Sequence, residues 1–155
     1  MESKALDLNK LKDTITYQWR VQSFSKNKPL CSCVAYIDAR DVMDMLDKVV
    51  GAENWQDKYE VINKQLFCSL GIAVNGEWVW KQDTGTESQT EKEKGQVSDA
   101  FKRAAVKWGV GRFLYNLTIR YIDTNEVKKD GNYPFPIDKS GKRIYDLTTY
   151  INNLK

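Results

Sequence analysis

The stretch Thr90–Tyr115, TEKEKGQVSDAFKRAAVKWGVGRFLY, decides the fold of this chain. Its apolar residues recur at helical spacing and predict a long helix with one buried stripe. They are Val97, Ala100, Phe101, Ala104, Ala105 and Trp108. Thr90 and Glu93 have the spacing of a capping box, so we expect the helix to begin as early as Thr90. Gly109 and Gly111 predict its end, because glycine commonly follows the last helical residue.

Basic residues lie on the other side of this predicted helix. Lys102, Arg103 and Lys107 fall away from the apolar stripe, and Lys92 lies in the same sector. A basic helix face is usually only solvated. Val106, an apolar residue among these cations, indicates instead that another subunit or a ligand covers the face. A row of cations on a rigid helix would suit a chain of phosphates.

Composition limits the possible functions. The chain has 155 residues, of which 41% are hydrophobic, enough for one globular domain with a sizeable core. A net charge of +3 permits nucleic-acid binding without requiring it. There is no histidine, which excludes histidine-based triads and histidine metal ligands. We expect a cytoplasmic protein, because no segment has the apolar length of a membrane span or a signal-peptide core.

The three cysteines predict reduced thiols. Cys31 and Cys33 are two residues apart, so on a strand they would share a face. Cys68 stands alone, and no second pair exists to complete a zinc site. An odd number of cysteines is typical of a reducing compartment.

The N-terminal third predicts two strands followed by a helix. A short amphipathic helix is expected within residues 1–15, and strands over Tyr17–Phe24 and Cys31–Ile37. Arg20 would project from the polar face of the first strand. Asp38 is placed to cap a helix over residues 39–50 that ends at Gly51. The residues expected on its buried face are Ala39, Val42, Met43, Leu46, Val49 and Val50.

A β-hairpin is expected next. Residues 57–74 read as one long strand or two short ones, and Asn75-Gly76 predicts a type I′ turn. The return strand, residues 77–82, carries Trp78 and Trp80 on one face. The order of elements predicts an α+β fold, in which an antiparallel sheet with a hairpin is packed by the long helix.

The C-terminal part is more polar. A short strand is expected over Ile119–Ile122 and a short helix over Ile144–Leu154. Between them, Asp123–Lys142 has the composition of a mobile basic loop.

No catalytic or metal-binding arrangement emerges from the acidic residues. Asp38, Asp41, Asp44 and Asp47 recur every three residues and are best interpreted as a solvated edge, although a neighbouring subunit's basic surface could also meet them. Carboxylates that could suggest a nuclease fall on a predicted loop and helix start instead of a strand pair. These residues, with a nearby lysine, are Asp83, Glu87, Glu91, Glu93 and Lys94.

Three runs of the chain closely resemble the Rad-fifty-two/Sak family of single-strand annealing proteins, in the form carried by phages and bacteria. The runs are YIDARDVMDMLDKVVGAENWQ (Tyr36–Gln56), CSLGIAVNGEWVWKQDTGTES (Cys68–Ser88) and KGQVSDAFKRAAVKWGVGRFLY (Lys94–Tyr115). The resemblance implies a β-β-β-α core with the long helix behind the sheet, assembled into a ring or helical oligomer. It implies binding of single-stranded DNA in a positive groove and pairing of complementary strands without ATP, a cofactor or a metal.

The resemblance also implies the extent of the domain and its cellular setting. One DNA-binding and annealing domain is expected over residues 1–155, with its core at about 15–120 and a basic loop and C-terminal helix at 123–155. The expected role is homologous recombination and DNA repair in the cytoplasm of a bacterial host. A phage or host exonuclease or a single-strand-binding protein would be a further partner, and no membrane is involved.

The DNA-binding residues follow from matching positions. Lys102 and Arg103 match the Lys-Arg pair that the family uses in its inner groove. Arg20, in WRVQS, matches in position a strand arginine of the same groove, and Lys94 matches another basic residue of the long helix. Eukaryotic members carry a further arginine where this chain has valine at position 106, and we expect Lys107 to compensate.

Other interpretations stay open at this stage. Tyr36 and Arg40 lie in a matching segment, where packing and DNA contact are equally compatible with the sequence. The chain could coat single strands without annealing them. It could be a small nuclease, or a structural oligomer whose basic helix meets the acidic row.

Overall fold

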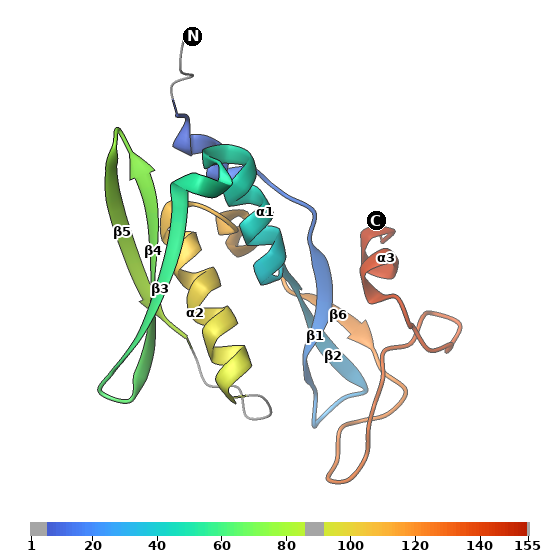
Figure 1. Ribbon diagram of the computed structural model, residues 1–155. Helices are drawn as coiled ribbons and strands as arrows, with labels where there is room; N and C mark the ends of the chain where they lie inside the picture. The colour runs from blue at the N-terminus through green and yellow to red at the C-terminus, as the bar shows by residue number, and fades with distance from the viewer. Residues whose placement is uncertain (1–5, 86–91, 155) are drawn as a thin grey trace. The chain divides into compact units, whose positions relative to one another are not determined.

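The computed structural model describes residues 6–85 and 92–154, with the backbone alone for residues 92–94. The chain divides into two compact units, each described by itself below. Unit 1 comprises Met1–Thr16 and Ile37–Phe113, and unit 2 comprises Tyr17–Tyr36 and Leu114–Lys155. Helices and two antiparallel three-stranded sheets, ordered β3-β4-β5 and β1-β2-β6, confirm the predicted α+β class (Figure 1).

Unit 1 begins with a short 3₁₀ helix and continues with α1. The helix η1, Leu8–Lys12, is shorter than the expected amphipathic helix, and it buries Leu11 completely. The helix α1, Ala39–Val50, has the predicted boundaries. Asp38 caps it as predicted, because Asp38 Oδ1 accepts from the Asp41 N–H at 3.0 Å and Asp41 Oδ2 accepts from the Asp38 N–H at 2.8 Å.

The buried face of α1 differs from the prediction at one turn. Val42, Leu46 and Val50 are buried as expected. Met43 is 37% exposed, whereas Met45 is buried at 5%. The prediction for Met43 was therefore wrong, because hydropathy alone cannot tell which of two nearby methionines lies closer to the centre of the stripe.

The sheet of unit 1 is a meander of three strands, joined to α1 by the short helix η2, Ala52–Asn54. Its strands are β3, Trp55–Ile62, β4, Gln65–Val74, and β5, Glu77–Thr84. The predicted turn is confirmed, since Asn75 and Gly76 both have positive φ, 53° and 81°. Residues 57–74 form two strands, because Asn63 and Lys64 make a second tight turn with φ of 50° and 67°.

The long helix α2, Lys92–Trp108, contacts β4 and β5 of this sheet. Phe101 stacks on Trp55 with ring centroids 5.9 Å apart, and the Trp108 indole N–H donates to the Leu70 carbonyl at 3.0 Å. The alanines Ala100, Ala104 and Ala105 have no exposed surface. These small residues let the helix approach closely, and removing a ring such as Phe101 from this interface would cost about 3–5 kcal/mol.

The ends of α2 agree only in part with the prediction. Gly109 ends the helix with a φ of 118°, and its N–H donates to the Ala105 and Val106 carbonyls. Val97 was predicted to be buried but is 39% exposed. Thr90 and its capping box with Glu93 lie outside the described residues.

Unit 2 contains the second sheet and the last helix. Its strands are β1, Gln18–Phe24, β2, Leu30–Tyr36, and β6, Arg120–Asp123, and its helix is α3, Leu147–Asn152. The 3₁₀ helix η3, Arg112–Asn116, spans the boundary between the units. As predicted, Cys31 and Cys33 share one face, where they form a core with Trp19, Ile122 and Ile151. All three cysteines of the chain are buried free thiols.

The segment between β6 and α3, expected to be a mobile basic loop, is a loop with isolated bridges and backbone hydrogen bonds. The Ile137 N–H donates to the Asp123 carbonyl at 2.8 Å, and the Ile144 N–H donates to the Pro136 carbonyl at 2.9 Å. Bridges pair Thr124 with Pro136 and Ile137 with Arg143. The segment is thus folded back on itself and fixed by backbone hydrogen bonds, which composition does not reveal.

Candidate nucleic-acid interface

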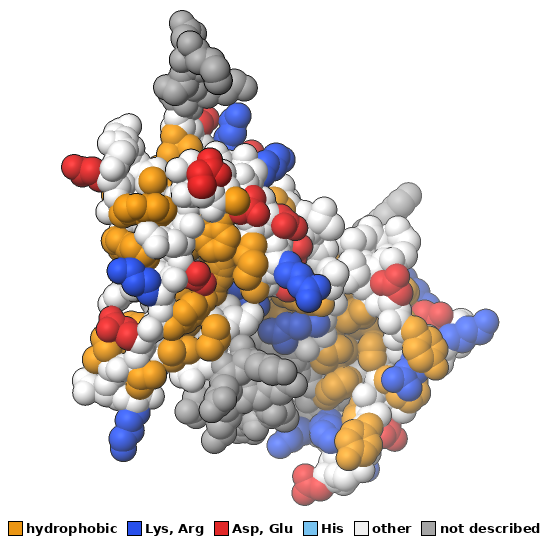
Figure 2. All heavy atoms as spheres, in the orientation of Figure 1, with side chains coloured by type: hydrophobic (Ala, Val, Ile, Leu, Met, Phe, Trp, Pro, Cys, Tyr) orange, Lys and Arg blue, Asp and Glu red, His pale blue; other side chains and the backbone are white. Residues whose placement is uncertain are grey.

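The positive charge of the chain belongs to one unit. Unit 2 contains ten Lys and Arg against five Asp and Glu, whereas unit 1 contains fourteen against sixteen. The net charge is therefore +5 for unit 2 and −2 for unit 1. Figure 2 shows Lys and Arg side chains among hydrophobic ones on the visible face of unit 2. Sequence reasoning missed this division because the unit assembles from two separate stretches of the chain.

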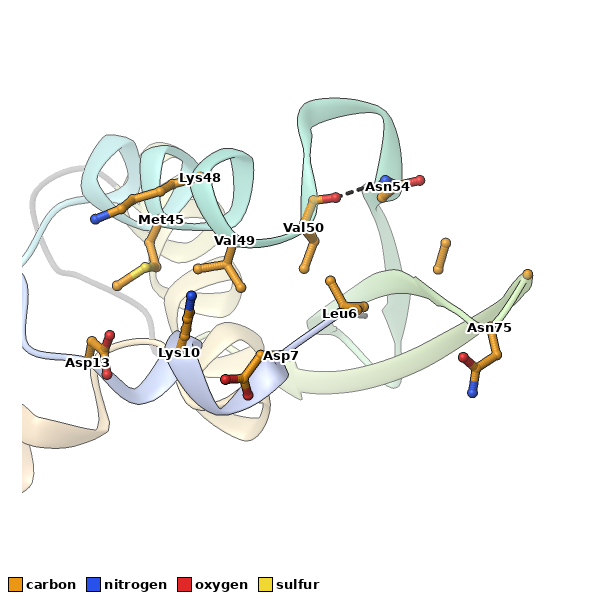
Figure 3. Close-up of a pocket in the computed structure, with 12 residues that line it drawn as sticks. Leu6, Asp7, Lys10, Asp13, Met45, Lys48, Val49, Val50, Asn54 and Asn75 are labelled. Carbon is orange, nitrogen blue, oxygen red and sulfur yellow. Dashed lines mark hydrogen bonds between the residues drawn. The ribbon is translucent and has the colours of Figure 1, made fainter. Parts of the chain in front are cut away.

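A hollow in unit 1 is lined by residues of η1, α1 and the β4–β5 hairpin (Figure 3). It has a volume of about 850 Å³, and its lining includes Asp7 and Lys10 near η1, Met45 and Lys48 of α1, and the hairpin residue Asn75. Of the predicted DNA-binding residues whose side chains the structure describes, none lines it. Its mixed lining shows no concentration of one charge, so it is not the candidate interface.

The α2 cations are less free than the helical pattern predicted. Lys102 is half-buried, and its Nζ donates to the Ile37 carbonyl at 3.4 Å, just before α1. This contact ties α2 to the start of α1. The prediction that Lys102 faces outward from the helix is therefore wrong in part, because its ammonium group is hydrogen-bonded to the protein's own backbone.

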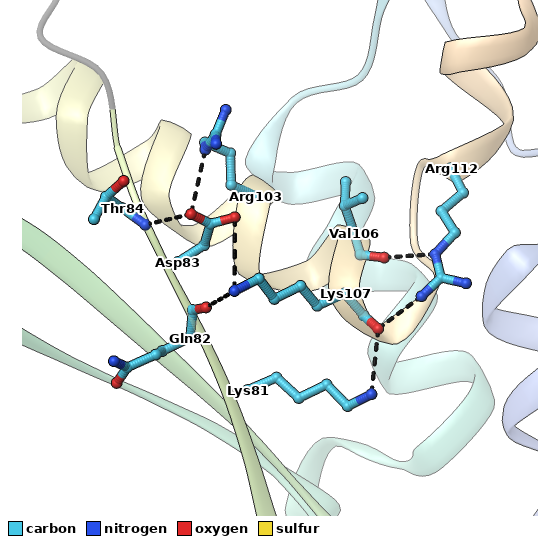
Figure 4. A network of polar contacts seen from close by, with 8 residues as sticks. All are labelled: Lys81, Gln82, Asp83, Thr84, Arg103, Val106, Lys107 and Arg112. Atoms are coloured by element: carbon cyan, nitrogen blue, oxygen red, sulfur yellow. Dashed lines mark hydrogen bonds and ion pairs between the residues drawn. The ribbon is translucent and has the colours of Figure 1, made fainter.

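Arg103 and Lys107 share one counterion on β5 (Figure 4). Arg103 Nε lies 3.6 Å from Asp83 Oδ1, and Lys107 Nζ lies 4.0 Å from Asp83 Oδ2. Lys107 Nζ also donates to the Gln82 carbonyl. The Arg103 and Lys107 side chains are still 46% and 48% exposed. Two half-exposed cations on one carboxylate leave a net positive charge that can meet a phosphate.

Two further cations that the sequence analysis did not single out gather at the end of α2 (Figure 4). Arg112 donates from Nε to the Val106 carbonyl and from Nη2 to the Lys107 carbonyl, each at 2.8 Å. Lys81 Nζ donates to the same Lys107 carbonyl at 3.4 Å. They donate to carbonyls in the last turn of the helix and complement its negative end. The sequence signal for Arg112 was its position just after the helix, whereas Lys81, on β5, had none.

Arg20 lies in unit 2, on the face of β1 opposite to the core. It is exposed, whereas its neighbour Trp19 is buried, as the alternating pattern predicted. Its guanidinium lies 5.8 Å from the centroid of the Tyr36 ring, and the Tyr36 hydroxyl donates to Gln18 Oε1 at 2.6 Å. A cation and an aromatic ring on an open sheet face can contact a phosphate and a base together.

The predicted residues divide between the two units. Arg103 and Lys107 meet at Asp83, Lys102 turns to α1, and Arg20 belongs to the other unit. Lys94 lies within α2, but its side chain lies outside the described residues.

Asp83 is the one carboxylate of the nuclease alternative whose side chain lies within the described residues. Asp83 is engaged by Arg103 and Lys107, and Glu87, Glu91 and the Glu93 side chain lie outside the described residues. In the part of the chain that the structure describes, no group of three or more Cys, Asp or Glu residues could hold a metal ion. Within the same residues, no helix has the length and apolar character needed to cross a membrane.

The fold and composition define a mildly basic α+β protein. The chain belongs to the Rad52/22 family of double-strand break repair proteins, because the model of that family matches residues 2–133. The family resemblance found in the sequence is thereby confirmed. No solved structure matches the chain.

Two curated relatives come from Deinococcus. The single-stranded DNA-binding protein DdrA of Deinococcus radiodurans is 29% identical over 116 residues, which cover 74% of this chain and 55% of the relative. The protein of the same name from Deinococcus deserti is 31% identical over 114 residues, which cover 72% of this chain and 56% of the relative. The chain thus spans about half the length of these relatives.

Proposed function

We propose that this chain binds single-stranded DNA and pairs complementary strands without ATP, in homologous recombination and DNA repair. The observation that carries the proposal is membership of the Rad52/22 family over residues 2–133. The two relatives are named as single-stranded DNA-binding proteins, which supports single-stranded DNA as the ligand.

The proposed DNA contacts are Arg20, Lys94, Lys102, Arg103 and Lys107. Arg103 and Lys107 are the best placed in unit 1, since half of each side chain is open to solvent. Cations of this kind hold the backbone regardless of sequence by releasing counterions, and they leave the bases free to pair. Annealing in this way makes and breaks no covalent bond, so the proposal needs no catalytic residue, metal or nucleotide.

Assembly is part of the proposal. Strands β3, β4 and β5 with α2 would be the family's β-β-β-α core, and both units would serve one annealing domain over residues 1–155. A ring or helical oligomer would line up one groove from many subunits, so that weak contacts in each subunit add up along one strand. An exonuclease or a single-strand-binding protein, of a phage or its host, would supply the strands, in the bacterial cytoplasm.

A protein that coats single strands without annealing them is the second candidate. The names of the relatives favour it, because they state binding to single-stranded DNA and do not mention annealing. Coating and annealing use the same phosphate contacts, so only the rate of strand pairing separates them.

The test mixes two complementary labelled oligonucleotides without ATP and follows duplex formation at low and moderate salt. The variants are Arg20→Gln and the pair Arg103→Gln with Lys107→Gln. The matched control is Lys10→Gln with Lys48→Gln, two exposed cations beside the hollow of unit 1. We expect faster pairing with the native chain and the control. In the variants, the slope of log K against log salt concentration should become shallower by about 0.7 for each phosphate that is no longer bound.

The possible results separate the candidates. Tight binding of single strands with no faster pairing would establish coating and reject annealing. Equal losses in the control and in the variants would show that net charge, and not these residues, governs binding. If the native chain binds no single-stranded DNA, both candidates fail.

A further inference from the structure

The segment between β6 and α3 has a fixed backbone that carries aromatic and basic side chains. Its turn is held by Asp138, whose carboxylate accepts hydrogen bonds from the Ser140 hydroxyl at 2.7 Å and from the Lys142 N–H at 2.9 Å. These hydrogen bonds hold the pKa of the Asp138 carboxyl below its usual range. The Asn125 side chain also accepts from the Phe135 N–H at 2.8 Å. The side chains of this segment are therefore presented from a defined support.

Cations in this segment lie against aromatic rings. The Arg143 guanidinium is 4.5 Å from the centroid of Phe135 and 4.9 Å from that of Tyr145. Lys128 Nζ is 5.7 Å from the centroid of Tyr133. Tyr133 and Tyr145 are 88% and 86% exposed, so most of each side chain can be reached from solvent.

These cations also have no acidic partner among the described residues. The ion pairs found in the described chain both involve Asp83 of unit 1, so neither Lys128 nor Arg143 is paired with a described carboxylate. They belong to the unit with a net charge of +5. Lys128 Nζ does donate to the Asn132 carbonyl at 2.6 Å, so Arg143 is the more available of the two. In contrast to Arg103 and Lys107, both can meet a phosphate without displacing a carboxylate.

We propose that Lys128, Tyr133, Phe135, Arg143 and Tyr145, called here the aromatic–basic surface, are a second contact for single-stranded DNA. The tyrosine rings stack on bases, and the neighbouring cations bind phosphates. The inference rests on the proposed function and deepens it, because it adds base contacts to the phosphate contacts proposed above. Three of the five residues lie beyond residue 133, where the family match ends.

The pairing of rings with cations favours a nucleic acid over an acidic peptide. A nucleotide presents a flat base next to a negative phosphate, and each exposed tyrosine here has a cation beside its ring. An acidic peptide would engage the cations but would leave the exposed rings without a stacking partner. Stacking tolerates any base, which suits a protein that must bind strands of any sequence.

The test compares two fluorescent probes of equal length, about 20 nucleotides and so longer than a typical binding site. One probe is oligothymidine, and the other is an abasic strand with the same phosphates. The main variant is Tyr133→Ser with Tyr145→Ser in the full chain. Arg143→Gln tests the charge. The matched control is Tyr115→Ser, which removes a tyrosine that is 74% exposed and lies outside this surface.

We expect the native chain to bind oligothymidine roughly tenfold more tightly than the abasic strand, which corresponds to one stacked base. The tyrosine variant should lose this preference while binding the abasic strand as before. Arg143→Gln should weaken binding of both probes, and Tyr115→Ser should change neither.

Each contrary result has a separate meaning. If the native chain binds neither probe, the proposed function fails and the inference fails with it. If it binds both, and the tyrosine variant behaves like Tyr115→Ser, the proposed function stands and the inference is overturned. If the tyrosine variant and Arg143→Gln lose binding of a glutamate-rich peptide and keep full DNA affinity, the surface belongs to an acidic protein partner, which also overturns the inference.

Discussion

Neutralising Asp83 should strengthen DNA binding, although it removes two ion pairs. Asp83 is the shared counterion of Arg103 and Lys107, at 3.6 and 4.0 Å. The substitution Asp83→Asn keeps Oδ1, which accepts from the Thr84 N–H at 2.7 Å, and keeps the size of the side chain. It therefore releases the two cations with little other change to the strand.

The magnitude follows from counterion release. Each phosphate contact with a single strand changes log K by about 0.7 for a tenfold change in salt, so one added contact raises affinity about fivefold at roughly 0.1 M salt, and two raise it about 25-fold. The stability cost is small, because ion pairs this exposed contribute at most about 1 kcal/mol after solvent screening. We expect Asp83→Asn to remain folded and to bind more tightly.

The assay is fluorescence anisotropy with labelled oligothymidine at several salt concentrations. Glu77→Gln is the matched control, since it removes one exposed carboxylate from the same strand. It should raise affinity by less than about twofold, because it alters only the long-range charge. Equal affinities of the two variants, or weaker binding by a folded Asp83→Asn, would refute the idea that the α2 cations contact DNA.

Three further perturbations test the fold. Burial raises the pKa of the Cys68 thiol to about 11 from an ordinary 9.0, so its contribution to stability is fully present below pH 9. About 2 kcal/mol of this stability should be lost as the pH rises to 11. Urea unfolding of the native chain and of Cys68→Ala across that pH range would show the loss, and parallel pH dependences would contradict it. A Cβ at Gly71 would lie 2.8 Å from the Trp80 ring, so Gly71→Ala should lower the free energy of unfolding by about 1–3 kcal/mol and shift the tryptophan emission. In a Trp80→Leu background, the same substitution should cost much less, because the ring that it meets is gone. Lys102→Met should lower the free energy of unfolding by about 1 kcal/mol, because it removes the hydrogen bond to the Ile37 carbonyl. Arg40→Gln, which also removes one cation, is the control. Equal thermal unfolding of the two variants would argue against that hydrogen bond.

Local signals in the sequence were enough to predict the regular elements. The Asp38 cap, the Asn75-Gly76 turn and the buried side of α2 depend on residues within a few positions of one another. The turn at Asn63 and Lys64 gave a weaker signal, since lysine rarely adopts positive φ and no glycine marks the site. The Met43 and Val97 exposures were missed because hydropathy does not report what packs against a helix.

The candidate site was harder to predict, because a cation's availability depends on partners that are distant in sequence. Periodicity placed Arg103 and Lys107 on a polar helix face, but their counterion comes from β5 across the fold. The hydrogen bonds within the loop after β6 were not predicted for the same reason. Its hydrogen bonds join residues such as Ile144 and Pro136, which a composition argument treats as independent.

These pairings change which cations matter for a phosphate chain. A cation that already holds a carboxylate or a carbonyl gains less from a phosphate, because it must give up that partner first. On α2, Lys102 is engaged by Ile37, and Arg103 and Lys107 share Asp83. Arg20 and Arg143 of unit 2 contact only aromatic rings among the described side chains. If free cations govern affinity, Arg20→Gln or Arg143→Gln should weaken DNA binding more than Arg103→Gln, although the long helix is the most specific segment in the sequence.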